Sequence, residues 1–199
     1  MIPMRILAVA DVEDDLLLAR LSGGHAGRYD LVVSCGDLGP SYLDCVATMA
    51  NAPLLYVRGN HDIGYEDSFA MGGTNLDGRV VEACGLRFAG LEGSLDYREG
   101  IVGYSQAVMV RKAAALGLRA ALTGGIDVLV THTPPRGYGD LPDGPHQGFD
   151  AFNGLLNWVH PRLMLHGHVH LDYGMFERER VHPSGTKLVN AFRWKEIEL

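Results

Sequence analysis

The feature that most constrains the fold of this chain is a succession of short apolar runs that each stop at a glycine or a polar residue. Runs of roughly four to eight residues rich in valine, isoleucine and leucine are typical of buried strands. The segments that we expect to form strands are 4–10, 30–35, 53–58, 80–91, 127–131, 162–166, 173–181 and 187–192. Apolar residues recur at helical spacing at 14–21, 41–50, 104–122 and 149–159. Strands that alternate with helices indicate parallel βαβ units.

This pattern predicts an α/β fold in which a mixed-sheet sandwich is flanked by helices. The segment 79–91 has Cys84-Gly85 at its middle and predicts a hairpin, as do the last two or three strands. The chain of 199 residues is long enough to bury a sizeable core. We find no internal repeat, low-complexity tract or linker, so we expect a single domain over residues 1–199.

The net charge disfavours two classes of partner, and the cysteine content indicates the redox state of the thiols. A net charge of −7 and a pI of about 5.6 disfavour long nucleic acids and anionic membranes, which need clustered lysine and arginine. A small phosphate-bearing substrate stays possible, because a bound metal can supply positive charge locally. The 3 cysteines are scattered and odd in number, which favours reduced thiols. No apolar run approaches the ~20 residues of a membrane span, so we expect a cytoplasmic protein.

Polar residues with metal-binding side chains follow five of the predicted strands. They are Asp11 and Glu13 after 6–10, Asp37 after 31–35, Asn60, His61 and Asp62 after 54–58, His132 after 127–131, and His168 and His170 after 162–166. In α/β sheets, ligands bind at the carboxyl ends of the strands. One such residue would mean little, but five strand ends that converge predict a metal site.

The spacing of these residues has a physical meaning. In an extended segment, residues two apart point to the same side, so Asp11 and Glu13 can face one ion together. The same holds for His168 and His170. The glycines that precede ligands are Gly36, Gly59 and Gly167. A missing side chain at these positions lets the backbone turn tightly or approach an ion closely.

Taken together, these motifs resemble those of the calcineurin-like metallophosphoesterase superfamily. The matching segments are Asp11-Val12-Glu13, Gly36-Asp37, Gly59-Asn60-His61-Asp62, Thr131-His132 and Gly167-His168-Val169-His170. They span residues 11 to 170, nearly the whole chain. The resemblance implies a four-layer αββα fold, and the compact length is similar to that of small bacterial phosphodiesterase-like members that have no large capping domain.

The resemblance also implies a role for each of these residues. One metal would be held by Asp11, position 13 and His170. The other would be held by Asn60, His132 and His168, and Asp37 would bridge the two metals. His61 would contact the phosphate and act as general acid, and Asp62 would fix the tautomer of His61. The family usually has histidine where this chain has Glu13.

Glu13 changes the expected metal. Glutamate suits manganese, magnesium or ferric iron, whereas imidazole better suits zinc or nickel. We therefore expect two divalent or transition metal ions, with manganese favoured and iron, magnesium, zinc or nickel as alternatives. If Glu13 instead turns away, the first metal site is weak or empty. Asp14 and Asp15 are expected in the first turn of a helix, where acidic side chains are favourable.

Two divalent ions about 3.5–4 Å apart can share a hydroxide and stabilise both the attacking and the leaving oxygen of an in-line displacement. We therefore expect hydrolysis of a small or nucleotide-type phosphoester, foremost a phosphodiester, by attack of a metal-bridging hydroxide with His61 as general acid. A nuclease or a phosphoprotein phosphatase is the alternative within this class, although the acidic pI argues against long duplexes. A catalytically silent metal- or nucleotide-binding protein is the alternative outside it. The oligomeric state does not follow from the sequence, although the C-terminal FRWKEIEL could pair two chains.

Other polar residues allow two interpretations each. His166 is expected to be a core or supporting histidine rather than a ligand. A segment rich in glycine and proline follows His132 and must run beside the site. Its candidate substrate contacts are His146, Arg136 and Tyr138, and the alternative is an ordered surface loop. Arg58 precedes Gly59 and either meets a phosphate or pairs with an acid.

Overall fold

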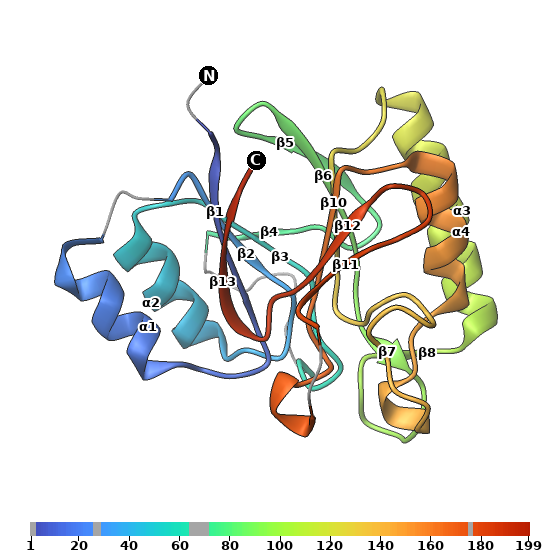
Figure 1. Cartoon of the computed structure of the whole chain (residues 1–199), viewed down its shortest axis with the longest axis horizontal. Coiled ribbons are helices and arrows are strands. Elements are labelled where there is room, and N and C mark those ends of the chain that lie inside the picture. Colours follow the sequence, from blue (N-terminus) through green and yellow to red (C-terminus); the bar gives the residue numbers. More distant parts are fainter. Residues whose placement is uncertain (1–2, 26–28, 64–71, 175–176) are drawn as a thin grey trace.

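The apolar runs form two mixed β-sheets stacked face to face, in a computed structural model that describes residues 3–25, 29–63, 72–174 and 177–199 (Figure 1). The first sheet contains β1 (Arg5–Ala10), β2 (Leu31–Ser34), β3 (Leu54–Tyr56), β4 (Thr74–Asn75) and β13 (Arg193–Glu198), in the order β13-β1-β2-β3-β4. The second contains β5 (Val80–Ala83), β6 (Leu86–Leu91), β9 (Val128–Thr131), β10 (Leu163–His166), β11 (Glu179–Val181) and β12 (Lys187–Asn190), in the order β11-β12-β10-β9-β6-β5. The short strands β7 (Ser94–Leu95) and β8 (Gly103–Tyr104) pair separately.

Parallel strands form the centre of both sheets. Strands β1 to β4 run parallel, and β13 joins β1 antiparallel. In the second sheet β12, β10, β9 and β6 run parallel, whereas β11 and β5 are antiparallel edge strands. Because the inner strands are parallel, their carboxyl ends meet along one edge of each sheet.

Helices cover the outer face of each sheet (Figure 1). Helices α1 (Asp15–Arg20) and α2 (Pro40–Ala50) pack on the first sheet, and α3 (Gln106–Leu122) and α4 (Asp150–Val159) pack on the second. A π-helical turn, Leu21–His25, follows α1, and 3-10 turns lie at Gly144–His146 and Leu171–Tyr173. Strand alternation explains the layers: in β1, Ile6 and Ala8 enter the core between the sheets, while Leu7 and Val9 face the helices. The predicted αββα sandwich is confirmed.

The C-terminal part of the chain corrects two predictions. Within the described part of 173–181 only Glu179–Val181 is a strand, because the 3-10 turn Leu171–Tyr173 precedes it; residues 175–176 lie outside the described part. Strands β11 and β12 form the predicted hairpin, but β13 leaves it and pairs with β1 in the other sheet. Ile197 of β13 thereby joins the core between the sheets. The C-terminal segment that could pair two chains thus pairs along one of its edges with β1 of its own chain.

The side chain of Arg178 holds this crossing between the sheets. Its guanidinium donates hydrogen bonds to the carbonyls of Asn190 (3.3 Å), Phe192 (3.2 Å) and Trp194 (3.1 Å). The regular ladder is interrupted where a chain passes from one sheet to the other, and leaving a buried carbonyl unpaired costs about 1–3 kcal/mol. One arginine therefore supplies donors to three acceptors at the point where the chain changes sheet.

Replacing Arg178 with methionine is expected to destabilise the protein by about 2–4 kcal/mol, because these carbonyls lose their donors while the aliphatic bulk stays. Urea denaturation followed by circular dichroism measures the change. Arg111→Met, on the exposed surface of α3, is the matched control and is expected to change stability by no more than about 0.5 kcal/mol. Equal losses in both variants would contradict the assignment.

Candidate metal centre

The predicted ligands gather where the strands of the two sheets end. Asp11 follows β1 and Asp37 follows β2, both in the first sheet, whereas His132 follows β9 in the second. One ligand atom from each of Asp11, Asp37 and His132 lies within 4.8 Å of the others. The edge between the sheets therefore brings together two carboxylates and an imidazole from distant parts of the sequence.

The Nε2 atom of His132 is a point of convergence. It lies 2.9 Å from Asn60 Oδ1, 3.1 Å from His168 Nδ1 and 3.4 Å from Asp37 Oδ2. These are the three residues that the resemblance grouped with His132 around one metal. Four potential ligand atoms, from four different loops, thus face one another.

Hydrogen bonds to carbonyls assign the tautomers of both histidines. His132 Nδ1 lies 2.8 Å from the Cys35 carbonyl, and His168 Nε2 lies 2.8 Å from the Pro145 carbonyl. A carbonyl only accepts, so each of these nitrogens carries a proton, and the neutral His168 offers a lone pair on Nδ1. His132 Nε2 faces three acceptors: Asn60 Oδ1, Asp37 Oδ2 and the His168 Nδ1 lone pair. In the metal-free protein a proton on His132 Nε2 serves these acceptors, and the same set of groups fits a metal ion in place of that proton.

The electrostatics of the cluster agree with this interpretation of the contacts. Burial alone would lower the pKa of His132, but the Asp37 carboxylate raises it to about 9. Burial alone would raise the pKa of Asp37, but His132 lowers it to about 2. The site thus attracts positive charge. Burial lowers the pKa of His168, which keeps that imidazole neutral and able to ligate a metal.

Asp11 leaves one carboxylate oxygen without a donor. Its Oδ1 accepts the backbone N–H of His168 at 2.8 Å, whereas its Oδ2 is buried and has no hydrogen-bond partner among the described residues. Burial raises the pKa of this carboxyl to about 7. A buried carboxylate oxygen without a donor is costly unless a cation compensates it. This oxygen is the second observation that fits a metal.

The backbone at the site is strained. Asp11, Asp37 and His168 have φ values of 68°, 57° and 70°, in the left-handed region. This region costs a residue with a side chain roughly 1–2 kcal/mol. Strain of this kind persists where the surrounding structure enforces it, which is common at functional sites. Three of the predicted ligands share it.

All three glycines predicted to allow a tight turn or a close approach do so. Gly36 has a φ of 98°, and a Cβ there would collide with the backbone of Gly59. A Cβ on Gly59 would collide with the carboxylate of Asp37, and a Cβ on Gly167 would lie 2.8 Å from Asp11 Oδ2. Gly59 and Gly167 therefore each leave room for a carboxylate, and any larger residue would push that carboxylate out of place.

Replacing Gly59 with alanine is expected to weaken manganese binding by at least about tenfold, because the new methyl group displaces the Asp37 carboxylate. Isothermal titration of the metal-stripped protein measures the affinity. The matched control is Gly154→Ala on α4, where no atom lies within 4 Å of the added Cβ. Unchanged affinity in Gly59→Ala would show that Asp37 does not hold the ion.

A pocket of ≈ 270 Å³ opens above these residues. Its lining includes the predicted site residues Asp11, Asp37, Asn60, His61, His168 and His170, together with Tyr97, Pro145, His146 and Tyr173. His170 stacks on Tyr173 with ring centroids 4.8 Å apart. The volume suits a small ligand seated directly over the carboxylates and imidazoles.

Glu13 is the predicted ligand that this arrangement leaves out. Its side chain is exposed, and its Oε1 accepts the N–H of Gly39 at 3.2 Å, next to the start of α2. A carboxylate is favourable there because the N-terminus of a helix carries partial positive charge. Ligation by Glu13 stays a prediction and would require the side chain to leave Gly39. Asp14 caps α1 by accepting the N–H of Leu16 at 2.9 Å.

His61 and Asp62 lie in the loop after β3, but they make different contacts. His61 donates its backbone N–H to Asp37 Oδ1 at 2.7 Å, and its ring lines the pocket. The Oδ2 of Asp62 accepts the N–H groups of Asp37 (2.8 Å) and Gly59 (2.7 Å), so it shapes the loop that carries Asp37. That Asp62 also fixes the tautomer of His61 stays a prediction.

Of the other candidates, His146 reaches the pocket. Its Nδ1 lies 2.6 Å from Asp143 Oδ2, and its ring lies 5.4 Å from that of His168. Arg136 lies 4.0 Å from Asp140 and is not among the pocket's lining residues. Arg58 pairs with the buried Glu92 through two contacts of 2.7 Å, which favours the ion-pair interpretation.

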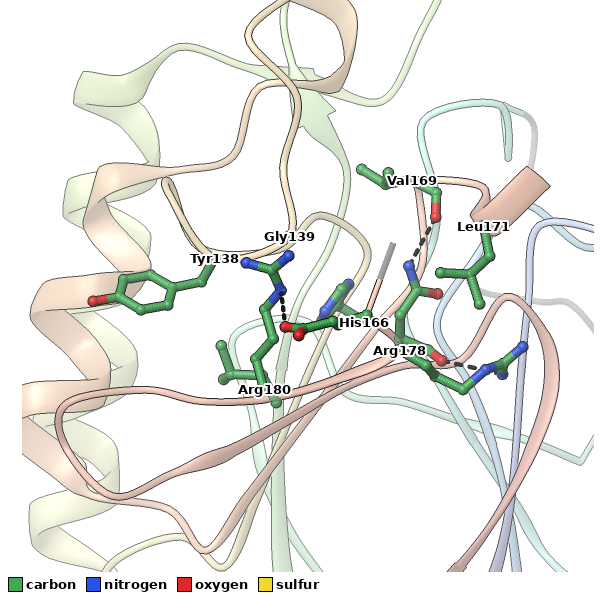
Figure 2. Close-up of a pocket in the computed structure, with 10 residues that line it drawn as sticks. Tyr138, Gly139, His166, Val169, Leu171, Arg178 and Arg180 are labelled. Atoms are coloured by element: carbon green, nitrogen blue, oxygen red, sulfur yellow. Dashed lines mark hydrogen bonds and ion pairs between the residues drawn. The ribbon is translucent and has the colours of Figure 1, made fainter. Parts of the chain in front are cut away.

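His166 and Tyr138 face a different, smaller pocket (Figure 2). His166 is buried, and burial lowers its pKa to about 4, so it is a neutral histidine beneath the loop that carries Tyr138. Arg178 and Arg180 lie at the same pocket. The structure thus agrees with the expectation that His166 supports the fold rather than ligating a metal.

Several groups at the site have no counterpart among the sequence motifs. The carbonyls of Cys35 and Pro145, which orient the two histidines, carry no sequence signature because any residue supplies a carbonyl. Tyr97, whose hydroxyl lies 3.3 Å from Asn60 Nδ2, and Arg98 belong to a connection without a motif. Only the fold brings Tyr97 to the pocket and Arg98 to the ring of His61.

A family model and curated proteins match this chain. The model of the calcineurin-like phosphoesterase superfamily domain matches residues 4–191. A UPF0046 protein of Caenorhabditis elegans is 24% identical over 212 residues, which cover 86% of this chain and 70% of that protein. A second UPF0046 protein of the same organism is 40% identical over 55 residues, which cover 27% of this chain and 14% of that protein.

Solved structures share the fold at low sequence identity. One aligns with 99% of this chain and 95% of its own length, at a TM-score of 0.72 and 16% identity. A hypothetical protein from Thermus thermophilus aligns over 94% of this chain and 75% of its own, at a TM-score of 0.53 and 16% identity. Haemophilus influenzae NAD nucleotidase aligns over 96% of this chain and 50% of its own, at a TM-score of 0.52 and 14% identity. At these identities the likeness shows the fold alone. No described helix is long and apolar enough to cross a membrane.

Proposed function

The chain belongs to the calcineurin-like phosphoesterase superfamily, and from this premise we propose that it is a single-domain, metal-dependent phosphoesterase, foremost a phosphodiesterase that hydrolyses a small or nucleotide-type ester. The observation that carries the proposal is the convergence of Asp37, Asn60 and His168 on His132 Nε2, at 2.9 to 3.4 Å. The unpartnered Oδ2 of Asp11, among the described residues, supports it independently.

The residues suited to hold metal form two groups around Asp37. Asn60, His132 and His168 form one group, and Asp11 and His170 the other, with Glu13 joining only if it leaves Gly39. This mixture of oxygen and nitrogen ligands suits manganese, and iron, magnesium, zinc or nickel are alternatives. When bound, such ions supply positive charge for the phosphoryl oxygens and lower the pKa of water.

The residues outside the two metal-binding groups would contact the substrate or hold the loop that carries His61. His61 lies at the pocket and can donate a proton to the leaving oxygen of the ester. Asp62 holds the loop of His61 and Asp37 through two backbone hydrogen bonds. His146, Tyr97 and Tyr173 line the same pocket and can contact the substrate.

Hydrolysis of bis-(p-nitrophenyl) phosphate by the metal-stripped protein, with and without added Mn²⁺, tests the proposal. Turnover that depends on Mn²⁺ and is restored by adding it back is the expected result. Asp44→Asn, an exposed change on α2, is the control for handling and folding. Binding of Mn²⁺ without turnover of this or other phosphoesters would contradict an enzymatic role.

The position of Glu13 favours one second candidate. Because its carboxylate lies on the Gly39 N–H, the group of Asp11 and His170 lacks the third side-chain ligand that the resemblance assigns to it. A protein that binds one metal and a phosphate-bearing ligand without hydrolysing it would fit. Manganese stoichiometry distinguishes the two: two ions per chain support the enzyme, and one ion supports the binding protein.

A further inference from the structure

The connection between β7 and β8, residues 96–102, is tied to the loop that carries Asn60 and His61. The backbone N–H of Val102 donates to the Asn60 carbonyl at 3.0 Å, and the hydroxyl of Tyr97 lies 3.3 Å from Asn60 Nδ2. Two contacts thus join this connection to a single predicted ligand. It is therefore part of the wall of the site, although no motif marks it.

Arg98 projects from this connection onto His61. Its Nη2 lies 3.4 Å from His61 Nδ1, and its guanidinium carbon lies 5.6 Å from the centroid of the Tyr97 ring. The side chain is exposed, and it pairs with no carboxylate among the residues that the structure describes. Arg98 is not itself a lining residue of the pocket, but it contacts two residues that are, His61 and Tyr97. In a chain of net charge −7, a cation beside these residues is informative.

The contact with His61 is directional. A guanidinium only donates hydrogen bonds, so His61 Nδ1 accepts and the ring proton lies on Nε2. Arg98 also adds positive charge beside a pocket whose floor contains the carboxylates of Asp11 and Asp37.

We propose that Arg98 is a substrate-binding residue that contacts a phosphoryl oxygen beside His61 and extends the substrates of this site to phosphomonoesters. This inference rests on the proposed function. Arginine binds two oxygens of a phosphate through its planar fork. A monoester presents three terminal oxygens and up to two negative charges, whereas a diester presents two oxygens and one charge. The added cation therefore favours the monoester.

The test compares Arg98→Gln with wild type on the manganese-loaded protein. Binding of inorganic phosphate is measured by isothermal titration, and kcat/KM is measured for p-nitrophenyl phosphate and bis-(p-nitrophenyl) phosphate. We expect phosphate binding and monoester hydrolysis to fall by about ten- to a hundredfold, and diester hydrolysis by no more than about threefold. Arg98→Lys is expected to recover part of the loss. Arg111→Gln, with the same charge change on α3, is expected to match wild type.

The outcomes separate this inference from the proposed function. Phosphate binding that weakens in Arg98→Gln, with neither ester hydrolysed by wild type, supports Arg98 and contradicts the esterase. Equal phosphate affinity in wild type and Arg98→Gln overturns the inference even if both esters are hydrolysed. An equal fall for monoester and diester overturns the monoester preference. Loss of bound manganese in Arg98→Gln would show that Arg98 acts through the metal centre, and would also overturn the proposal.

Discussion

Replacing Asp11 with asparagine is expected to lower metal-dependent turnover by about 10²- to 10³-fold, the loss typical when one preorganised electrostatic group is removed. Asparagine keeps the size of the side chain and tolerates the left-handed backbone at this position, where φ is 68°. Its oxygen can still accept the N–H of His168. The charge that would face the metal is lost, so the effect reports the ligand role rather than misfolding.

The same substitution is expected to stabilise the metal-free protein. Burial raises the pKa of Asp11 from 3.8 to about 7, because its buried Oδ2 lacks a donor among the described residues. Between these two values the folded state keeps a proton that the unfolded state has released. The contribution of Asp11 to the stability of the metal-free wild type therefore falls by roughly 2–4 kcal/mol as pH rises from about 4 to about 7. Asparagine has no such titration.

Urea denaturation of chelator-treated protein at pH 5 and pH 7 measures this effect. Asp11→Asn is expected to be more stable than wild type, and the difference is expected to widen at pH 7. Burial lowers the pKa values of His166 and His168, so these histidines make stability rise with pH in the same window. They are present in both proteins, so the difference between Asp11→Asn and wild type isolates the titration of Asp11. Asp44→Asn on α2 is the control. A stability difference that does not change with pH would contradict the burial argument.

The fold was predictable where one signal decides the structure. The run 127–131 is rich in apolar residues, is bounded by Gly125 and His132, and forms the central strand β9, buried on both faces. The C-terminal segment was harder because β13 has charged residues at four of its six positions and is an edge strand. The local pattern cannot tell which sheet it joins. That choice depends on the open edge of β1 and on Arg178, which lie outside the strand itself.

The candidate site was predictable to the extent that ligands follow strands. Parallel strands end together, so Asp11 and Asp37, which follow neighbouring strands of one sheet, meet at its edge. His132 reaches them because the second sheet stacks on the first with its strand ends at the same edge. The sequence could not show the rotamer of Glu13, because the competing partner is the backbone N–H of Gly39. It also could not assign the partner of the His61 ring, because Arg98 approaches through a connection whose course depends on the packing of β7 and β8.

Replacing His61 with alanine is expected to lower turnover by about 10²- to 10⁴-fold while bound manganese stays unchanged. The ring lies at the pocket and outside the group of atoms that converge on His132 Nε2, so its removal leaves that group complete. The backbone N–H of His61, which donates to Asp37 Oδ1 at 2.7 Å, is also kept in alanine. Metal analysis of the purified variant checks that its manganese content is unchanged. Loss of manganese would show that His61 is a ligand.

The identity of the leaving group separates the two roles that His61 can have. A general acid matters most when the departing oxygen is strongly basic, so the His61→Ala variant is expected to lose far more activity on an alkyl phosphoester than on a p-nitrophenyl ester, whose leaving group departs without a proton. A residue that only binds the phosphoryl group would cause the same loss for both esters. Because the His61 ring lines the pocket, within reach of a bound ester, the first result is expected. Equal losses would make His61 a binding residue and leave the proton donor to be found among the other groups at the pocket, where His146, 2.6 Å from Asp143, is the next candidate.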